Sequence, residues 1–483
     1  MRIDIFSGGY ANPFSPGTRS LQGDNLLETT MTPTSTRFWM PCRKAFLAMT
    51  LLAAAALAQP ALAQVMTTSV DADPSASAWG QWRGAARDGQ VSGTGWADNL
   101  DGLRPAWRVE LGKGYPGPVV GRDRVFVLGS DEVGTVTVRA LARLDGSEIW
   151  RKSWGAPAEV PFFAASHGAW VRSTPAYDGE MLFVGDMLEM VFALDGETGD
   201  ELWRIDLPRH YQVSEPPFGF ASSPLLDGDY LYVQAANGIV KLDKRTGVPV
   251  WRAAASPNNI MSGGAFSSPV LAELNGQRQL LVFTRAALTG VDPESGAVLW
   301  SQSVPNFRGM NIVTPMSYGN GIFVSQHRNG SHFYSVSSSN DVAPAWTSKG
   351  SGYMSTPVQI GDYAYLHLGN GRFSCIDLRT GEEKWRTTPF GEYWSIAWQG
   401  DKLLALDAEG ELRLIRANPD QYELLDEAAV ATASAWGHIA VAGEQVFVRE
   451  LEALNVFVWP SRGTPRVAAA GPASDNSDPD TRR

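Results

Sequence analysis

The stretch Leu194-Asp195-Gly196-Glu197-Thr198-Gly199, which leads to Trp203, is one copy of a pattern that recurs along the chain. In each complete copy an Asp precedes a Trp by eight positions, with Thr-Gly or Ser-Gly between them. The other complete copies are Leu242–Gly247 with Trp251, Val291–Gly296 with Trp300, and Ile376–Gly381 with Trp385. Shortened or degenerate copies precede Trp150 and surround Trp107 and Trp346. The unit repeats every ~46 residues on average, a spacing typical of β-propeller blades.

The chemistry of the repeat predicts a structural role for it. An Asp side chain can accept hydrogen bonds from the backbone amides of a turn, and Gly supplies the positive φ that closes the turn. The strand after the turn ends the blade with a Trp, whose large ring can fill the gap between neighbouring blades. The repeated Asp, Gly and Trp residues are therefore expected to build the fold rather than to carry chemistry.

A second repeated element, Ser or Thr followed by Pro, is expected to begin the innermost strand of each blade. Pro is tolerated at the first residue of a strand, where no donor of the hydrogen-bond ladder is lost. The copies are Arg172–Pro175, Ala221–Pro224, Phe266–Pro269, Val313–Pro315 and Met354–Pro357, with further blade starts near Pro116, Trp394 and Ala435. We therefore predict an all-β, eight-bladed β-propeller over residues 105–458, with seven blades as the alternative count.

The last predicted blade shows only three strands, ending at residues 454–457. Residues 105–111 read as an outer strand that has no blade before it. If this N-terminal strand docks on the last blade, it closes the ring and removes open strand edges. Residues 64–104 are then an N-terminal lead segment, and residues 459–483 are expected to form a disordered tail.

The N-terminal region carries the parts of a signal peptide. Arg43-Lys44 precedes an apolar run over residues 45–58 and the small-residue motif Ala61-Leu62-Ala63, so residues 40–63 are predicted to direct export, with cleavage after Ala63. The apolar run is too short for a transmembrane helix. No Cys stands at the cleavage point, which argues against a lipoprotein. Residues 1–39 are interpreted as a mis-assigned start or an unstructured extension, and the mature protein is expected to be periplasmic or secreted.

Composition narrows the function classes further. The chain has 483 residues, 51 of them acidic and 40 basic, for a formal net charge of −11. Such a balance disfavours nucleic acid as a partner, because binding phosphates requires basic surface. Only Cys42 and Cys375 are present, which excludes a disulfide framework or a Cys-rich zinc site. The mature chain is expected to be a monomer without a transmembrane segment.

The Leu-Asp-x-x-Thr-Gly-x-x-x-Trp repeat resembles that of the pyrroloquinoline-quinone (PQQ) family of β-propellers. The opening Trp79-Gly80-Gln81-Trp82-Arg83-Gly84, with Arg87-Asp88-Gly89 after it, resembles the N-terminal signature of secreted bacterial members. The resemblance covers about residues 79–458. It implies the fold but leaves the function open, because the superfamily holds quinoprotein dehydrogenases as well as non-enzymatic propellers such as the BamB subunit of the outer-membrane assembly machinery.

The enzymatic branch implies PQQ, a Ca²⁺ ion, an acidic base and commonly an adjacent cysteine pair. Cys375 is the only cysteine after the predicted cleavage point, so that pair cannot form. Glu215 and Asn311 lie near the predicted axial loops but form no recognisable ligand set. We therefore expect no catalytic residues, no metal and no cofactor. PQQ and calcium would apply only under the alternative function, a PQQ-dependent dehydrogenase that oxidises alcohols or sugars.

The remaining function is a binding or scaffold protein. Aromatic and polar residues precede the innermost strands, and blades in register would bring them around one mouth of the channel. The candidate binding residues are Trp170, Arg172, Phe220, Phe266, Asn311, Tyr353, Trp394 and Trp436. The alternative that they only pack the loops stays open. We expect a non-catalytic, exported propeller that binds a protein or peptide in the cell envelope, with outer-membrane protein assembly as a candidate setting.

Overall fold

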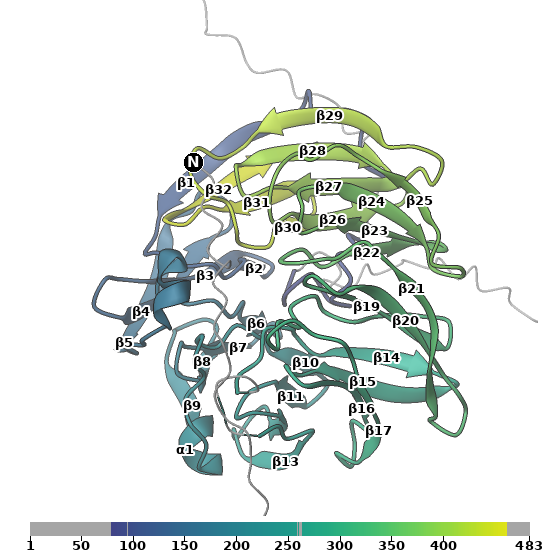
Figure 1. Cartoon of the computed structure of the whole chain (residues 1–483). Helices are drawn as coiled ribbons and strands as arrows, with labels where there is room; N and C mark the ends of the chain where they lie inside the picture. The colour runs from purple at the N-terminus through teal and green to yellow at the C-terminus, as the bar shows by residue number, and fades with distance from the viewer. Residues whose placement is uncertain (1–78, 94, 258, 260–262, 461–483) are drawn as a thin grey trace, which may run out of the picture. The chain divides into compact units, whose positions relative to one another are not determined.

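The computed structural model describes residues 79–93, 95–257, 259 and 263–460, which fold as a β-propeller of eight four-stranded sheets (Figure 1). The prediction of eight blades is confirmed. Helix in this part of the chain is limited to the 3-10 helix η2 (Phe162–His167) and to α1 (Leu207–Tyr211). The predicted extension over residues 1–39 and the predicted signal peptide over residues 40–63 lie outside the described residues.

The first four blades follow one another along the chain. Blade 1 consists of β2 (Val119–Val120), β3 (Arg124–Ser130), β4 (Thr135–Ala142) and β5 (Glu148–Gly155). Blade 2 consists of β6 (Ala176–Tyr177), β7 (Met181–Gly185), β8 (Met190–Asp195) and β9 (Glu201–Asp206). Blade 3 consists of β10 (Leu225–Asp227), β11 (Tyr230–Val233), β12 (Ile239–Asp243) and β13 (Pro249–Ala253). Blade 4 consists of β14 (Val270–Leu274), β15 (Gln277–Phe283), β16 (Ala287–Val291) and β17 (Val298–Ser303).

The other four blades complete the ring. Blade 5 consists of β18 (Met316–Tyr318), β19 (Gly321–Gln326), β20 (Gly330–Val336) and β21 (Val342–Ser348). Blade 6 consists of β22 (Val358–Ile360), β23 (Tyr363–His367), β24 (Phe373–Asp377) and β25 (Glu383–Arg386). Blade 7 consists of β26 (Ser395–Gln399), β27 (Lys402–Leu406), β28 (Glu411–Arg416) and β29 (Glu423–Ala429). Blade 8 consists of β30 (Ala440–Ala442), β31 (Gln445–Arg449), β32 (Ala453–Val458) and β1 (Arg104–Glu110).

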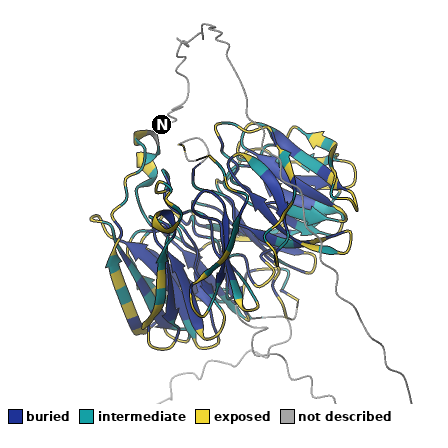
Figure 2. Cartoon of the chain, turned by 90° about the horizontal axis from the view of Figure 1, so that it is seen from below, coloured by how far each residue is buried: buried dark blue, intermediate teal, exposed yellow. Residues whose placement is uncertain are grey.

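Burial follows the position of a strand within its blade. In blade 2 all residues of β7 are buried, whereas every residue of β9 is exposed or half-buried. Middle strands are covered by neighbouring blades on both faces, so they read as continuous apolar runs. The core therefore lies between the blades, and exposed residues lie mainly on the outer strands and loops (Figure 2).

Blade 8 is closed by the N-terminal strand, as the sequence predicts. Strand β1 pairs antiparallel with β32 from Arg104↔Val458 to Glu110↔Ala453. The observed strand begins and ends one residue before the predicted range of 105–111. A register shift between Pro105 and Trp107 accommodates the proline, which has no amide hydrogen to donate. The two ends of the propeller chain are thus joined within one sheet.

The repeated Trp and Gly residues form the contact between neighbouring blades. Trp203 of blade 2 donates from its indole Nε1 to the carbonyl oxygen of Lys244 in blade 3, at 2.8 Å. Its ring lies so close to Gly247 that a Cβ on that glycine would stand 2.5 Å from it. The same packing joins Trp107 with Gly146, Trp150 with Gly199, Trp251 with Gly296, and Trp346 with Gly381. The structural interpretation of the repeat is therefore correct.

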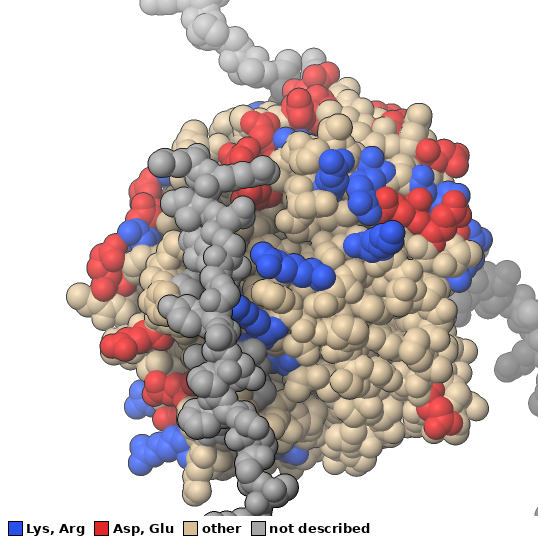
Figure 3. All heavy atoms as spheres, viewed as in Figure 1, with Lys and Arg blue, Asp and Glu red and all other residues tan. Residues whose placement is uncertain are grey.

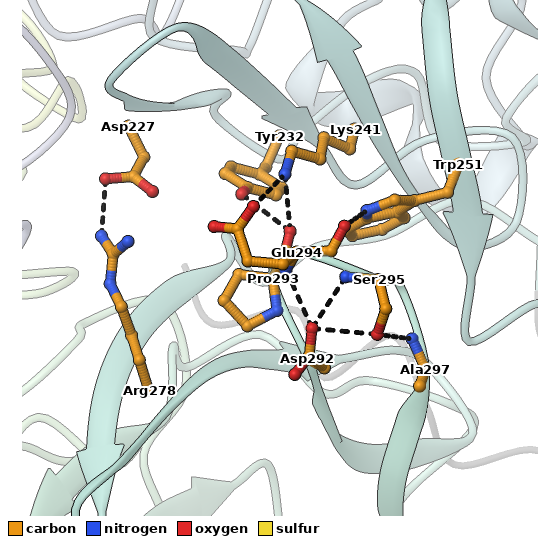
Figure 4. A network of polar contacts seen from close by, with 10 residues as sticks. All are labelled: Asp227, Tyr232, Lys241, Trp251, Arg278, Asp292, Pro293, Glu294, Ser295 and Ala297. Atoms are coloured by element: carbon orange, nitrogen blue, oxygen red, sulfur yellow. Dashed lines mark hydrogen bonds and ion pairs between the residues drawn. The ribbon is translucent and has the colours of Figure 1, made fainter. Parts of the chain in front are cut away.

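The repeated Asp organises the turn that presents this glycine. In blade 4, Asp292 accepts hydrogen bonds from the amides of Glu294 and Ser295 (Figure 4). The bonds with Ser295 hold the pKa of the Asp292 carboxyl below its usual range. The carbonyl of Glu294 then accepts the indole hydrogen of Trp251 from blade 3, at 3.1 Å. One turn thus satisfies its own amides and docks the preceding blade.

We expect Gly247→Ala to destabilise the protein by roughly 2–4 kcal/mol, because it places a Cβ both at positive φ and against the Trp203 ring. Gly228→Ala is the matched control in the same blade: its φ is also positive, but nothing lies within 4 Å of the new Cβ. Gly228→Ala should lower the free energy of unfolding by only about 1 kcal/mol. Urea unfolding of both variants checks the difference, and equal losses would contradict the packing role.

Candidate functional site

The innermost strands surround an axial channel that is lined by a ring of hydroxyl groups. The Ser or Thr before each proline accepts a hydrogen bond from a backbone amide of the preceding blade. Thr174 accepts from Gly117 at 3.0 Å, Ser223 from Thr174 at 3.1 Å, Ser268 from Ser223 at 3.0 Å, Thr314 from Ser268 at 3.2 Å, and Thr356 from Thr314 at 3.4 Å. Ser395 instead accepts from Ile439 of the following blade, at 3.1 Å. The hydroxyl ring thus links successive blades at the axis.

The Ser/Thr-Pro element is visible in the sequence, but the hydrogen bonds that its hydroxyl groups form between blades are not. The sequence predicts that the proline begins the strand, but it assigns no function to the hydroxyl residue before it. Recurrence of a hydroxyl residue at the same offset in successive repeats was the available signal. A cavity of about 140 Å³ lies inside the ring, lined by the hydroxyls, aromatic side chains, Arg172 and His438.

The N-terminal segment, residues 79–91, closes one end of the channel; we refer to it as the strap. Its backbone bridges Trp79 to Val120 in blade 1 and Gln90 to Trp398 in blade 7. Between these points Arg83 donates to the carbonyl of Pro357 in blade 6, at 2.6 Å. The signature motif quoted from the sequence therefore contacts blades on different sides of the ring.

Trp82 of the strap forms the floor of the cavity. The guanidinium groups of Arg83 and Arg87 lie 5.5 and 5.2 Å from the centre of its ring. Arg87 also donates to the carbonyls of Pro224 and Ser223 in blade 3. Burial lowers the pKa of Arg83 to about 10 and that of Arg87 to about 9. Both arginines stay charged at neutral pH.

The opposite end of the channel is the mouth, where half-buried rings form a continuous series of contacts that we call the aromatic arc. The arc consists of Tyr115, His167, Trp436, Tyr393, Tyr353, His327 and Phe307. Ring centres lie 4.9 Å apart for Tyr115–Trp436, 5.0 Å for His167–Trp436, 4.6 Å for Tyr393–Trp436, 5.8 Å for Tyr353–Tyr393, 4.3 Å for His327–Tyr353 and 5.7 Å for Phe307–His327. These rings come from loops of several blades, so the arc is a surface that only the closed ring assembles.

Arginines flank both ends of the aromatic arc. Arg172 lies 5.6 Å from the ring centre of Tyr115, and Arg328 lies 4.8 Å from that of Phe307. Neither arginine forms an ion pair with a carboxylate in the part of the chain that the structure describes. Burial lowers the pKa of His327 to about 4, so that side chain is neutral at pH 7. The positive charge at the mouth therefore comes from arginines that have no acidic partner there.

Five of the predicted binding residues lie at the axis or the mouth. Arg172, Phe266, Trp394 and Trp436 line the cavity, and Tyr353 belongs to the aromatic arc. Trp394 is only 1% exposed and stacks on His367, so most of its ring is core. These positions confirm that blade entries converge on the axis; their role in binding stays a prediction.

The other three predicted residues lie elsewhere. Phe220 is 2% exposed and packs between blades 2 and 3, where Gly185 leaves room for its ring. Asn311 is fully buried and donates to the carbonyl of Thr284 at 2.9 Å. Trp170 lies under the ammonium group of Lys113, outside the cavity lining. Neighbouring strands and loops enclose the side chains of Phe220 and Asn311, which agrees with the alternative that these residues pack the loops; a role for them in binding stays a prediction.

Sequence reasoning missed the other rings of the arc. Tyr393 directly precedes Trp394, and Tyr115 directly precedes Pro116, so both stand at predicted blade starts without having been selected. His327 lies in a hairpin rather than in a blade-entry loop. An aromatic residue within three positions of a blade start is the sequence pattern that could have identified Tyr115 and Tyr393. This pattern does not identify His327.

Burial of His367, which stacks on the cavity residue Trp394, is expected to make the stability of the protein sensitive to acid. His367 is 3% exposed, and burial lowers its pKa from 6.5 to about 4. Because the folded state disfavours the charged ring, this group's contribution to stability is complete above pH 6.5 and is lost as the pH falls toward 4. The loss amounts to about 3 kcal/mol.

We expect the pH dependence of unfolding to be shallower between pH 6.5 and 4 for His367→Gln than for the wild type. Urea unfolding at several pH values measures it. His210→Gln, at an exposed position of α1, is the control and should follow the wild type. Parallel curves for His367→Gln and the wild type would show that protonation of His367 carries no such penalty.

The residues at the axis do not fit a Ca²⁺–PQQ centre. Calcium is bound by six to eight oxygen ligands, with carboxylates prominent among them. No carboxylate lines the axial cavity, and the described residues contain no group of three or more His, Cys, Asp or Glu side chains placed to hold a metal. A cavity near 150 Å³ takes a molecule of about the size of benzene, and PQQ, a fused tricyclic quinone with three carboxylates, is much larger.

The comparisons with known proteins agree with the repeat. The sequence model of the family described as "Outer membrane protein assembly factor BamB" matches residues 134–387. The curated outer membrane protein assembly factor BamB of Yersinia pestis is 21% identical over 310 residues, which cover 59% of this chain and 75% of that protein.

Solved structures of two functional classes share the fold. BamB of Moraxella catarrhalis is 16% identical, with a TM-score of 0.54 over 74% of this chain and 99% of its own. Quinohemoprotein alcohol dehydrogenase of Comamonas testosteroni is 15% identical, with a TM-score of 0.56 over 80% of this chain and 81% of its own. At these identities the structures establish the fold alone.

A search of the described residues for membrane-spanning helices found none of sufficient length and apolarity. The resemblance to the PQQ-repeat propellers is confirmed by the family match, which spans more than half of the sequence. The protein is therefore a β-propeller that belongs to the family of the outer membrane protein assembly factor BamB.

Proposed function

We propose that this protein is a non-catalytic propeller of the cell envelope that binds a protein or peptide partner at its mouth, in the setting of outer-membrane protein assembly. Three findings support the proposal: the family match, the absence of carboxylates from the axial cavity, and the aromatic arc. The proposal includes export, because the relative from Yersinia pestis is named for outer membrane protein assembly, which takes place in the cell envelope.

The aromatic arc is the observation that carries the proposal. Tyr, Trp and Arg are enriched among the residues that contribute most to protein interfaces. The arc presents half-buried rings whose partners within the chain hold them in place, so little side-chain entropy is lost when a partner covers them. Arg172 and Arg328 at its ends add donors for the partner's acidic groups.

The distribution of charge supports a protein rather than a nucleic acid. The chain carries a net charge of −11 overall, which repels polyanions at long range. On the face seen in Figure 3, most acidic side chains lie toward the rim, while several basic side chains lie nearer the middle (Figure 3). At the mouth itself the positive charges are those of Arg172 and Arg328, so a partner with local acidic and aromatic groups matches it without a basic surface over the whole molecule.

The experiment is capture from envelope extracts of the source cells with immobilised protein. The double variant Tyr353→Ala/Tyr393→Ala removes the middle of the arc and should reduce recovery of the captured protein at least tenfold, since such anchors contribute about 1.4 kcal/mol or more each. Tyr230→Ala, in β11 of blade 3 and outside the arc, is the matched control and should capture normally. Equal recovery by all three proteins would refute the role of the mouth.

A dehydrogenase is the second candidate, because a quinohemoprotein alcohol dehydrogenase has the same fold and the fold alone does not separate the two functions. Incubation with PQQ and Ca²⁺, followed by an assay of alcohol or sugar oxidation with an artificial electron acceptor, separates the two functions. The proposed function predicts neither tight PQQ binding nor turnover. Turnover that depends on both additions would replace the proposed function with the enzymatic one.

A further inference from the structure

We propose that the axial cavity is a binding site for a carboxylate group. The cavity lies between the Trp82 floor and the aromatic arc, and its volume is about 140 Å³. The inference goes beyond the proposed function, because it rests on the donors of the cavity itself and stands whether or not the mouth binds a protein.

The hydroxyl ring supplies the donors. Each of six hydroxyl oxygens accepts one backbone amide hydrogen, which occupies one of its two lone pairs and leaves its O–H free to donate. These hydroxyls belong to Thr174, Ser223, Ser268, Thr314, Thr356 and Ser395. None of these hydroxyls donates its own hydrogen to a protein acceptor among the described residues. All six line the cavity. The ring therefore directs a set of unused O–H donors toward one small space.

Arg172 adds a charge to these donors. Arg172 lines the cavity, and its Nη2 donates one hydrogen bond to the carbonyl oxygen of Gly168, at 2.7 Å. Its Nε–H is buried without a hydrogen-bond partner in the described structure. A buried donor that lacks an acceptor is costly, and a charged one more so. An anion in the cavity would satisfy both the guanidinium and the hydroxyls.

The floor of the cavity strengthens the preference for negative charge. Arg83 and Arg87 are each 3% exposed, flank Trp82, and form no ion pair with a carboxylate within the described residues. Asp88 lies close enough to Arg83 to oppose the lowering of its pKa, but neither arginine has a carboxylate at ion-pair distance within the described residues. Two such buried positive charges favour an anion nearby, because little water screens them. His438 contributes no positive charge, since burial lowers its pKa to about 3.

Size and charge together point to a carboxylate. A cavity near this volume holds a molecule of about the size of benzene, which leaves room for acetate or for an acidic side chain or chain terminus of a peptide. A planar carboxylate has several lone pairs and matches a guanidinium flanked by hydroxyl donors. A carboxylate offers about four lone-pair sites and brings no donor of its own, so it accepts from more of these groups at once than a single water, which offers two.

The test is titration of the purified protein with sodium acetate against sodium chloride at constant ionic strength. Binding is read by calorimetry and by tryptophan fluorescence, because Trp82, Trp394 and Trp436 line the cavity. We expect saturable binding of acetate that Arg172→Gln weakens about tenfold or more, since a hydrogen bond to a charged group is lost. Thr356→Val should also weaken acetate binding. The hydrogen bond from the Thr314 amide to the Thr356 hydroxyl is the longest in the ring, at 3.4 Å, so we expect its loss to disturb the fold least.

Arg204→Gln, on the outer strand β9, is the matched control and should bind acetate as the wild type does. No saturable signal with acetate, or equal binding by Arg172→Gln and the wild type, would overturn the proposal and leave a water-filled channel. Sulfate binding as tight as that of acetate would overturn the assignment to a carboxylate.

Two further ligands distinguish the source of the group. A short peptide with a free terminal carboxylate and its C-terminal amide are titrated in the same way. Binding of the acid but not of the amide assigns the site to a peptide terminus, whereas binding of acetate alone assigns it to a free small carboxylate. Both results support the carboxylate site. Equal binding of the acid and the amide, with acetate displacing neither, would contradict it.

Discussion

A chain in which residues 104–110 are replaced by a Gly/Ser linker of equal length is expected to lose about 5 kcal/mol of stability or more, and to self-associate. The replaced residues form β1, which pairs with β32 along the edge of blade 8. The replacement also removes Trp107, whose ring packs on Gly146 and whose indole donates to the carbonyl of Arg143 at 3.2 Å. Trp107 is half-buried against the core, so its loss accounts for part of the change, and the loss of a whole paired edge strand accounts for the rest.

Thermal unfolding and size-exclusion chromatography measure the two effects. The matched control replaces β25, the outer strand of blade 6, which does not join the two ends of the chain. That control should lose stability but leave blades 8 and 1 linked, so it should unfold at a higher temperature than the β1 replacement. Equal melting of the β1 replacement and the wild type would show that ring closure contributes nothing.

Removal of the strap is expected to have the second-largest effect. A chain that begins at residue 92 lacks Trp79, which is 4% exposed, together with the ties from Arg83 to blade 6 and from Arg87 to blade 3. Compared with a chain that begins at Trp79, it should be less stable by about 4 kcal/mol or more, because one buried Trp and several buried hydrogen bonds are lost.

The strap also predicts a change in access to the channel. Without Trp82 as its floor, the axial cavity becomes open at both ends, so acrylamide should quench the fluorescence of Trp394 more strongly. Trp79→Ala in the otherwise intact chain keeps Trp82 and tests packing alone; it should lower stability by about 3–5 kcal/mol. Unchanged melting and quenching in the shortened chain would mean that residues 79–91 do not hold the blades together.

The fold could be predicted because its determinants are local and repeated. The Asp turn, the glycine at positive φ and the Trp each act over a few residues, so each leaves a visible pattern in the sequence. The closing strand was predictable as well, since residues 105–111 formed an outer strand without a blade and blade 8 lacked one. The prediction of eight blades therefore depended on eight blade starts along the sequence, together with the strand that the last blade lacked.

The site could be predicted only in part, because burial depends on neighbours that the sequence does not show. Phe220 and Tyr353 both stand four residues before the proline of a blade start. Phe220 is buried because Gly185 of blade 2 leaves space for its ring, whereas Tyr353 packs on His327 and stays half-exposed in the arc. The same position in the repeat thus gives a core residue in one blade and a surface residue in another.

The contacts of the strap could not be predicted from the sequence either. Its residues were recognised as a signature motif, but the contacts of Arg83 and Arg87 lie 274 and 137 residues away in the sequence. No local pattern indicates that two arginines tie blades on different sides of a ring, or that Trp82 closes the channel. The long-range placement became visible only in the structure.

Site-specific photo-crosslinking in intact cells tests the central claim most directly. A photoreactive phenylalanine analogue at Tyr393 places the probe in the aromatic arc, and one at Tyr363 places it on β23 outside the arc. We predict a discrete crosslinked product with an envelope protein from position 393, absent at position 363 and abolished when Tyr353 and Trp436 are also changed to alanine. No product from the arc, or the same product from both positions, would contradict the account.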